Sequence, residues 1–399
     1  MEERLEEKPL LVNKTATTDI KLYFPKWLAY TFLTCITFLH MMSYILSLYV
    51  TGQYTYVYFL EEKYPGAPHS LSGSLATCAI DKSSIEYKVQ TEIQKISAEW
   101  GIYTNLAFII PSLLLNINLA TYSDVHGRKL FFIVPLVGTV LKNIMCGVGM
   151  YYNINARLML IFYMIEACTG TWVATLCMSF CFIADTTKPG KRRSIVIAVV
   201  EGGIGFGSLI AQFISGYTIT GTNGFFYPQI IAAALALIPL VIVLLFIEET
   251  LPESKRRTHV SIIQNMKRVF ECYKPNFSQY GKRWMFVVLL LMFIMSVSAN
   301  LSRGNVEYLY QIASPFCWDS VKIGVYGAIR TSFWNIGSIL MISVFQLFTS
   351  DAVIALLGCV TTIATLIVEG LAQTDTMLYI CMYILTFADT KLSILISIK

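Results

Sequence analysis

Charged residues are scarce in this sequence. Only 14% of its 399 residues are Asp, Glu, Lys or Arg, whereas 55% are hydrophobic, and the mean hydropathy is +0.60. A soluble globular domain carries about 25% charged residues, so this composition excludes an ordinary water-soluble domain. The long apolar segments also lack the alternation of apolar and polar residues that bilayer-spanning strands require. The sequence therefore predicts an all-α, polytopic membrane protein.

Enzyme motifs are also lacking. The sequence contains no Gly-x-Ser-x-Gly, no His-Glu-x-x-His and no paired metal ligands, so we predict no enzyme, no metal site and no cofactor. The net charge of +5 does not indicate nucleic acid, because the bases stand in loops beside apolar segments, as the positive-inside rule expects. A cleavable signal peptide is not expected either, since residues 1–26 are polar and the first apolar run is too long.

Apolar segments of about 20 residues are long enough to cross a bilayer as helices. We predict ten of them: 27–51, 99–121, 130–150, 157–183, 194–218, 227–247, 283–302, 321–346, 352–372 and 376–399. The predicted parts are a tail at 1–26, a six-helix half at 27–247, a central loop at 248–282 and a second half of four helices at 283–399. Lys and Arg are concentrated in the tail, in the central loop and in two short turns. This distribution predicts a cytoplasmic N-terminus and an exoplasmic loop at 52–98.

A short polar turn separates the second and third apolar segments. It reads Tyr-Ser-Asp-Val-His-Gly-Arg-Lys over residues 122–129. Asp124 can pair with Arg128, and Gly127 can take the positive φ that a tight reversal needs. The pattern Asp-x-x-Gly-Arg-Lys, ending at Lys129, resembles the signature loop of the major facilitator superfamily, although Ala120 replaces the usual leading glycine. The resemblance implies a cytoplasmic gate at this turn and two six-helix halves, so helices 11 and 12 are expected to be missing here.

Further stretches resemble one branch of that superfamily, solute carrier family 46, which contains the proton-coupled folate transporter. They are Gly52-Gln53-Tyr54, Tyr103-Thr104-Asn105 and the run 309–319 with its Cys-Trp-Asp sequence. The resemblance implies a secondary active transporter, coupled to protons, for a small amphipathic or anionic organic solute, folate-like or other. Two alternatives stay open. One is a proton-independent facilitative carrier, and the other is a truncated membrane protein that does not transport and has an interaction role.

The same resemblance implies a disulfide between the first exoplasmic loop and the loop before helix 8. Cys78 and Cys317 stand at those positions. Disulfides persist on the oxidising side of a membrane, and two free thiols are the alternative.

Ionisable residues inside membrane helices cost roughly 2.5–3.5 kcal/mol at mid-depth, so each is a functional candidate. Glu201 falls at the position of the acid that couples protons in the folate transporter, and a structural carboxyl is the alternative. Glu166 is a second candidate for proton coupling, since the family's helix-4 acid is replaced here by Thr171. Lys142 lies at similar depth and could pair with Glu166.

Four residues are predicted to contact the substrate. Arg330 is a candidate for an anionic group because its guanidinium forks onto carboxylates, with pairing inside the second half as the alternative. Asn300 stands where the folate transporter has a His, and Thr171 is included as the replaced acid. The family's helix-10 Arg is replaced by Asp389, which weakens folate as the substrate, and Lys391 could supply the missing positive charge.

The N-terminal tail carries Glu6 followed by Leu10 and Leu11. This spacing resembles an acidic dileucine signal and predicts binding to a sorting adaptor and a lysosomal or endosomal location. An ordinary tail and a plasma-membrane location are the alternatives. In the fifth apolar segment, Gly203 and Gly207 have the small-xxx-small spacing that favours close helix packing.

Overall fold

The computed structural model describes residues 23–65, 85–188, 191–251, 256, 291, 307–313, 315–345, 348 and 351–385. Within these ranges the chain forms helices and no strand, which confirms the all-α prediction. The helices are α1 (Lys26–Lys63), α2 (Ile85–His126), α3 (Arg128–Tyr151), α4 (Ala156–Ala167), α5 (Thr171–Thr186), α6 (Lys191–Thr222), α7 (Phe226–Phe246), α10 (Ser320–Phe345), α11 (Asp351–Gly370) and α12 (Asp375–Leu385). The predicted segment 283–302 falls outside the described residues, apart from residue 291.

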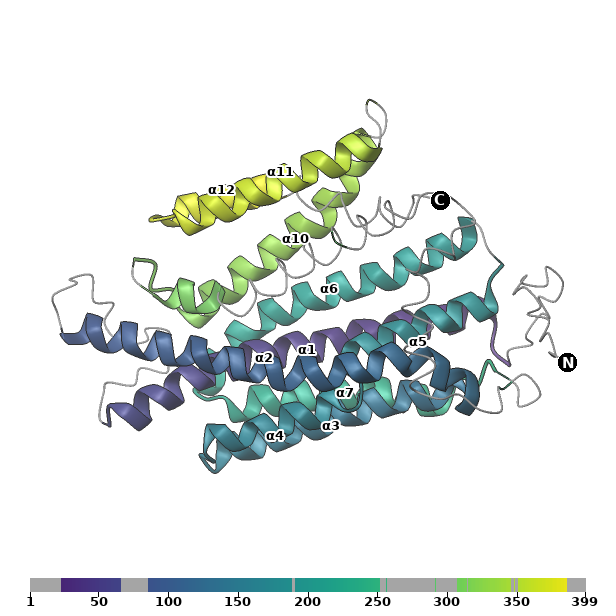
Figure 1. The fold of residues 1–399 in the computed structure, drawn as a ribbon, viewed down its shortest axis with the longest axis horizontal. Helices are drawn as coiled ribbons and strands as arrows, with labels where there is room; N and C mark the ends of the chain where they lie inside the picture. The colour runs from purple at the N-terminus through teal and green to yellow at the C-terminus, as the bar shows by residue number, and fades with distance from the viewer. Residues whose placement is uncertain are drawn as a thin grey trace, which may run out of the picture.

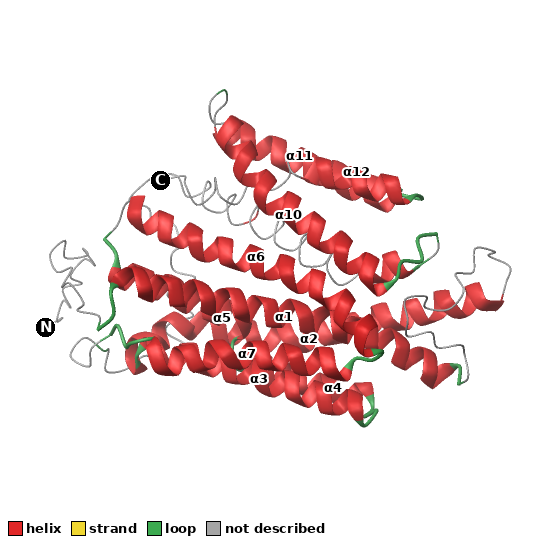
Figure 2. Ribbon diagram, turned by 180° about the vertical axis from the view of Figure 1, so that it is seen from behind, coloured by secondary structure: helices red, strands yellow, loops and turns green. Residues whose placement is uncertain are grey.

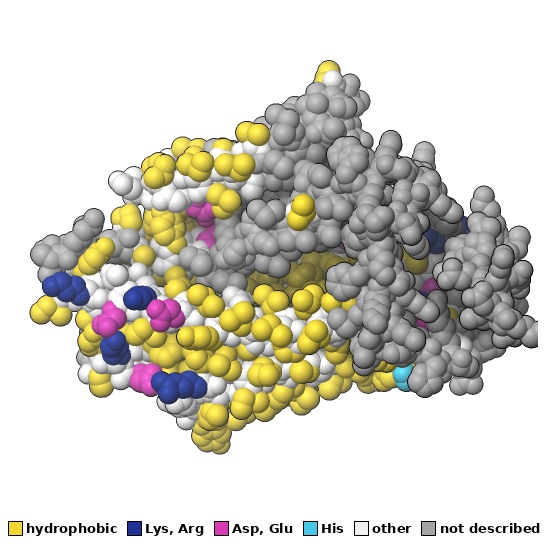
Figure 3. Space-filling model, in the orientation of Figure 1, with side chains coloured by type: hydrophobic (Ala, Val, Ile, Leu, Met, Phe, Trp, Pro, Cys, Tyr) yellow, Lys and Arg dark blue, Asp and Glu magenta, His cyan; other side chains and the backbone are white. Residues whose placement is uncertain are grey.

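Six stretches of the described chain are long and apolar enough to cross a membrane. They are Lys26–Lys63, Tyr87–Leu119, Arg128–Tyr151, Ala156–Thr186, Ile195–Thr222 and Phe226–Phe246. Figure 3 shows hydrophobic side chains over the middle of one face, with a group of charged side chains at its left end and a few more at its right end. This pattern suits a bundle whose outer surface contacts lipid.

Two helices extend into the segment 52–98, which the sequence analysis treats as a loop. α1 continues twelve residues past the predicted limit to Lys63, and α2 begins already at Ile85. Both extensions are amphipathic: Tyr56 and Leu60 from α1 pack with Ile93 of α2 in one apolar cluster. Hydropathy alone missed them because their exposed faces carry charged residues.

The segment 157–183, which the sequence predicts as one helix, forms two helices. α4 ends at Ala167, and α5 begins at Thr171. Gly170 and Thr171 both have positive φ, 99° and 64°, and an α-helix cannot continue through such a conformation.

α1 lies near the centre of the bundle, packed against α6 and α7, and α10 lies along α6 (Figure 1, Figure 2). We call the end that holds the turn at 122–129 the motif end, and the end that holds Lys63 and Trp318 the far end. At the far end, side chains of α1 and α2 share an apolar cluster with Leu309, Ile312 and Trp318. The Ser320 hydroxyl also donates to Gln53 of α1 at 2.6 Å. The first half and the start of the second half are therefore joined at the far end.

The predicted close packing of the glycines on α6 is confirmed. A Cβ at Gly203 would lie 2.9 Å from the Thr34 side chain, and a Cβ at Gly207 would lie 2.5 Å from the backbone oxygen of Phe38. These contacts let α6 approach the backbone of α1.

We expect the substitution Gly207→Ala to destabilise the protein by roughly 1–3 kcal/mol, because the added methyl group meets rigid backbone of α1. Gly202→Ala is the matched control, since nothing lies within 4 Å of a Cβ there and alanine favours the helix. Thermal unfolding of the detergent-solubilised protein should give a lower Tm for Gly207→Ala and an unchanged or higher Tm for Gly202→Ala. Equal Tm values for the two variants would contradict this packing.

Candidate functional site

A buried ion pair lies at mid-depth in the first half. The Nζ of Lys142 on α3 is 3.3 Å from Oε2 of Glu166 on α4, and the two side chains are 2% and 1% exposed. Lys142 stands 14 residues after Arg128, the first residue of α3, which is about 21 Å along the helix axis. The pairing predicted from the cost of these two charges in an apolar segment is confirmed.

Three polar side chains connect this pair to α1 and α5. The Thr139 hydroxyl donates to Oε1 of Glu166 at 2.9 Å. The His40 ring lies between two hydroxyls, with Nε2 2.9 Å from Thr139 Oγ1 and Nδ1 3.0 Å from Thr175 Oγ1. Since Thr139 gives its only proton to Glu166, the network places a proton on Nε2 of His40, which donates to Thr139.

A second set of polar contacts surrounds Lys142. Its Nζ donates to Ser47 Oγ at 2.9 Å, and Gln229 of α7 donates to the same oxygen at 2.9 Å. Gln229 also donates to Asn143 Oδ1 at 3.1 Å, and Asn143 donates to Ser43 Oγ at 3.0 Å. The ion pair thus belongs to a polar network that joins α1, α3, α4, α5 and α7.

The break between α4 and α5 follows Glu166 by four residues. Thr171 is β-branched, and a positive φ is strained for such a residue. The Gly170 carbonyl accepts a hydrogen bond from Asn116 Nδ2 at 3.1 Å, so α2 satisfies part of the exposed backbone. Interrupted helices often border the binding sites of transporters. Thr171 itself is fully buried, and its hydroxyl accepts from the backbone N–H of Val173 at 3.3 Å.

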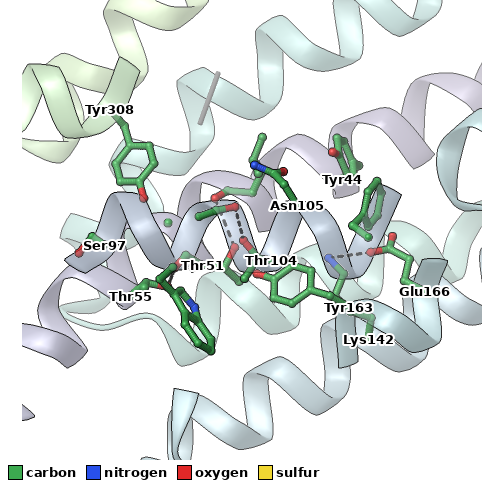
Figure 4. Close-up of a pocket in the computed structure, with 15 residues that line it drawn as sticks. Tyr44, Thr51, Thr55, Ser97, Thr104, Asn105, Lys142, Tyr163, Glu166 and Tyr308 are labelled. Carbon is green, nitrogen blue, oxygen red and sulfur yellow. Dashed lines mark hydrogen bonds and ion pairs between the residues drawn. The ribbon is translucent and has the colours of Figure 1, made fainter. Parts of the chain in front are cut away.

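A narrow cavity of about 70 Å³ leads to the ion pair (Figure 4). Lys142 and Glu166 lie at one end of it, and Ser97, Thr55 and Tyr308 lie toward the other, in the direction of the far end of the bundle. Its walls come from α1, α2, α3 and α4, with Tyr308 contributed by the second half. A pocket for a drug-sized molecule has roughly 300–1,000 Å³, so this cavity is too small for such a solute in this conformation.

The turn at the motif end is held by a carboxylate. Gly127, with φ of 96°, is the one residue between α2 and α3. Glu249, which follows α7, accepts from the backbone N–H of Arg128 at 2.8 Å and of Lys129 at 3.1 Å. A carboxylate stabilises the amides at a helix N-terminus. A Cβ at Gly127 would collide with the Glu249 side chain, so this position requires glycine for space as well as for φ.

The guanidinium of Arg128 connects three helices. It pairs with Asp124 of α2 at 2.8 Å and with Asp185 of α5 at 3.1 Å, and it donates to Ser123. The predicted pair between Asp124 and Arg128 is confirmed. These partners all belong to the first half, and the role of Asp124, Gly127, Arg128 and Lys129 as a gate stays a prediction.

Glu201 lies at the interface between the halves. It is exposed and stands one turn from Gly205, which faces Asn335 of α10. On the same face of α6, Gln212 donates to Thr331 of α10 at 2.8 Å. Residues 201, 205 and 212 recur at helical spacing, so Glu201 is directed toward α10 and away from the Lys142 network.

Arg330 has an internal partner. Its guanidinium forms an ion pair with Glu307, whose other oxygen accepts from Gln311 at 3.3 Å. This is the pairing inside the second half that the sequence analysis left open as an alternative to substrate binding.

Several predicted residues fall outside the described part of the chain. They are Asn300, Lys391, Cys78, Glu6, Leu10 and Leu11. Cys317 is disulfide-bonded, and its partner is none of the free described cysteines, which are Cys35, Cys146, Cys168, Cys177, Cys181 and Cys381. The pairing with Cys78 stays a prediction. In the described residues, no three His, Cys, Asp or Glu side chains are close enough to hold a metal ion.

Sequence reasoning missed most of the polar network. It gave no functional role to His40, Ser43 or Ser47. The three residues recur at spacings of three and four within an apolar segment, which places them on one helix face. That spacing was the available signal.

The comparisons with known proteins agree with this architecture. The family model described as Major Facilitator Superfamily matches residues 33–396. The chain is 28% identical to the lysosomal proton-coupled steroid conjugate and bile acid symporter of Bos taurus, over 87% of this chain and 75% of that protein. It is 23% identical to the proton-coupled folate transporter of Bos taurus, over 73% of this chain and 62% of that protein. The predicted resemblance is confirmed by these matches.

Solved transporters have the same fold. The structure superposes on a human organic anion transporter with a TM-score of 0.62 at 13% identity, covering 94% of this chain and 85% of that one. The xylose transporter of E. coli gives a TM-score of 0.56 at 13% identity, covering 92% of this chain and 84% of that one. These two similarities concern the fold alone.

We expect Glu249→Gln to destabilise the turn at the motif end, because a neutral amide accepts weaker hydrogen bonds from the two backbone N–H groups than a carboxylate does. Charge-assisted hydrogen bonds of this kind are worth about 1.5–3 kcal/mol, so the Tm should fall by several degrees. The neighbouring Glu248→Gln is the control, since Glu248 binds the exposed backbone N–H of Tyr23 at 2.8 Å and makes no contact with the turn among the described hydrogen bonds. A larger loss for Glu248→Gln would contradict this assignment.

Proposed function

The chain belongs to the Major Facilitator Superfamily, and from that premise we propose that it is a proton-coupled secondary transporter of a small amphipathic or anionic organic solute. Its family and fold are those of membrane transporters and not of enzymes. Relatives that share most of its length are proton-coupled carriers by name, one for steroid conjugates and bile acids and one for folate. The solute is expected to bind at mid-membrane between the halves, with access alternating between the two sides.

We assign proton coupling to Glu166 before Glu201. The supporting observation is the buried pair with Lys142 beside a cavity. When Glu166 is ionised, it is paired with Lys142. When Glu166 is protonated, Lys142 becomes a buried cation without a counter-charge. Protonation of Glu166 therefore changes the electrostatic energy of the first half, as a proton-coupling site requires.

Glu201 is the second candidate. Its position on the α6 face toward α10 supports this role, because a rocking movement of the halves would change the surroundings of that face. Arg330 remains a candidate for an anionic substrate group only if the second half releases it from Glu307, since the described pairing satisfies its charge.

The runner-up is a facilitative carrier without proton coupling. A buried ion pair can be purely structural, and the network of Lys142 and Glu166 would then only hold α1, α3 and α4 together. The two functions differ in whether a pH gradient drives uptake.

We further propose that the N-terminus and the motif end are cytoplasmic and that the far end is exoplasmic, from the distribution of Lys and Arg. A lysosomal membrane is the favoured location, since the steroid conjugate relative is lysosomal by name and the tail carries Glu6, Leu10 and Leu11. A sorting adaptor is the proposed partner of these residues, and the plasma membrane is the alternative location. A disulfide between Cys78 and Cys317 on the exoplasmic side belongs to the same proposal.

Glu166→Gln should abolish uptake driven by a pH gradient, because the amide keeps the shape of the acid but cannot take up the proton. The panel of labelled solutes is a steroid conjugate, a bile acid and folate, measured in proteoliposomes with acid or neutral solution outside. The single variant also leaves Lys142 unpaired, which costs about 3–5 kcal/mol. The double variant Glu166→Gln with Lys142→Met removes both charges, and it should recover the Tm without recovering pH-driven uptake.

Glu201→Gln, measured in parallel, separates the two carboxylates. If Glu166 couples the proton, Glu201→Gln keeps a response to pH and Glu166→Gln does not. The reverse result transfers coupling to Glu201. If the wild type takes up solute equally with and without the gradient, the facilitative carrier is correct.

The variant Leu10→Ala with Leu11→Ala should move a fluorescently tagged protein from lysosomes to the cell surface, because an adaptor needs both leucines. Surface biotinylation measures the shift. Lys8→Ala, which leaves the acid and both leucines in place, is the control and should stay lysosomal. An unchanged location of the double variant would refute the sorting signal.

A further inference from the structure

Two buried polar atoms in one cavity make no hydrogen bond with any described residue. They are Oγ of Ser97 on α2 and Oε2 of Glu166 on α4, and both residues are 1% exposed. Oε2 has the Lys142 Nζ at 3.3 Å as its ion-pair partner, which leaves part of its accepting capacity free. Buried polar atoms in native proteins nearly always have a partner, from protein or water, and an unsatisfied one costs about 1–3 kcal/mol. A small polar molecule is therefore expected to meet both atoms.

The cavity has the size and lining that water requires. One water molecule needs roughly 10–15 Å³ of cavity volume, so a cavity of about 70 Å³ has room for several water molecules. Each water molecule needs two to four polar partners. The walls offer hydroxyl and amide groups along the length, from Tyr44, Thr51, Thr55, Thr104, Asn105, Tyr163 and Tyr308.

We propose that this cavity is a water-filled path that brings protons from the far end of the bundle to Glu166. The proposal rests on the proposed proton coupling and adds its route. Ser97 and Thr55 lie toward the outer part of the path and Glu166 ends it (Figure 4). In the last step the water next to Oε2 passes a proton to the carboxylate and receives one from the water behind it. A neutral carboxylic acid results, and each water keeps its two hydrogens.

Glu166 is surrounded by charged and titratable groups from three helices. They are Lys142 and Cys146 from α3, Tyr163 from α4, Tyr44 from α1, and His40 of α1 through Thr139. α2 contributes Trp100, Thr104, Asn105 and Phe108 to the wall, which carry no charge. A proton that reaches the inner end rests on Glu166 because a carboxylate is far more basic than water. Lys142 opposes this uptake, since protonation removes the counter-charge of the ammonium.

The second half supplies the outer wall of the path. Tyr308 packs on Gly52, where a Cβ would lie 3.1 Å from Tyr308 Cζ, and it is continuous with the apolar cluster at the far end. Separation of the halves at this end would withdraw Tyr308 and widen the path. Access of protons to Glu166 then depends on the same movement that admits the solute.

Hydroxyl-radical footprinting of the full chain in nanodiscs tests the water directly. Tyr163 lines the cavity, whereas Tyr326 is completely buried elsewhere and serves as the internal control. We expect oxidation of Tyr163 but not of Tyr326, and at least about a threefold loss at Tyr163 in Ser97→Leu, because the longer side chain displaces water. The smaller Ser97→Val is the second variant if Ser97→Leu does not fold. Protection of Tyr163 equal to that of Tyr326 in the wild type would overturn the proposal.

Transport measurements then test the route. In Ser97→Leu the initial rate of uptake driven by a pH gradient should fall at least about fivefold, while exchange of solute at equal pH stays at the wild-type rate, because exchange moves no net proton along the waters. Thr91→Leu on the same helix is the control, since Thr91 is exposed and lies outside the cavity wall. A normal pH-driven rate in Ser97→Leu refutes the path. A wild type without pH-driven uptake refutes the proposed function instead, and the Tyr163 oxidation still reports the water.

Discussion

The ion pair between Lys142 and Glu166 constrains the whole first half. Two opposite charges at the depth of the hydrocarbon are tolerated only if they remain together and their remaining hydrogen-bonding groups are satisfied. That requirement draws in Thr139, Ser47 and, through them, side chains of α5 and α7. Removing either charge alone leaves the other buried without its counter-charge. The helices that carry these residues are thus joined by polar contacts as well as by their shared apolar clusters.

The break between α4 and α5 follows from the same constraint. A continuous helix through residues 156–186 would fix the direction of Glu166 relative to Thr175 by helical geometry alone. The positive φ of Gly170 and Thr171 uncouples the two segments, so that Glu166 can meet α3 while Thr175 meets His40 of α1. A strained β-branched residue persists only when its surroundings over-determine it, and here the polar network and the Asn116 hydrogen bond do so.

Much of the fold and part of the candidate site could be predicted from the sequence. Long apolar segments are a sufficient signal for membrane helices, and the cost of a buried charge identified Lys142 and Glu166 as partners. The helical extensions at the far end were not predictable from hydropathy, because α1 and α2 present one charged and one apolar face there. No role was predicted for Glu249, because nothing local relates it to the N–H of Arg128, 121 residues away. Contacts between distant segments depend on the packed bundle and not on spacing.

Both ends of the bundle limit how the protein can move. At the motif end, Arg128 and Glu249 join α2, α3, α5 and the end of α7 within the first half, so that half should move as one body there. At the far end the apolar cluster around Trp318 and the Ser320–Gln53 hydrogen bond connect the two halves. An opening toward the far end must therefore separate this cluster, while the ion pair, which lies wholly inside the first half, stays intact. Protonation of Glu166 can influence that opening by altering the positions of α1 and α2 against the second half. Tyr308, in contact with Gly52 of α1, is the described side chain best placed to sense such a change.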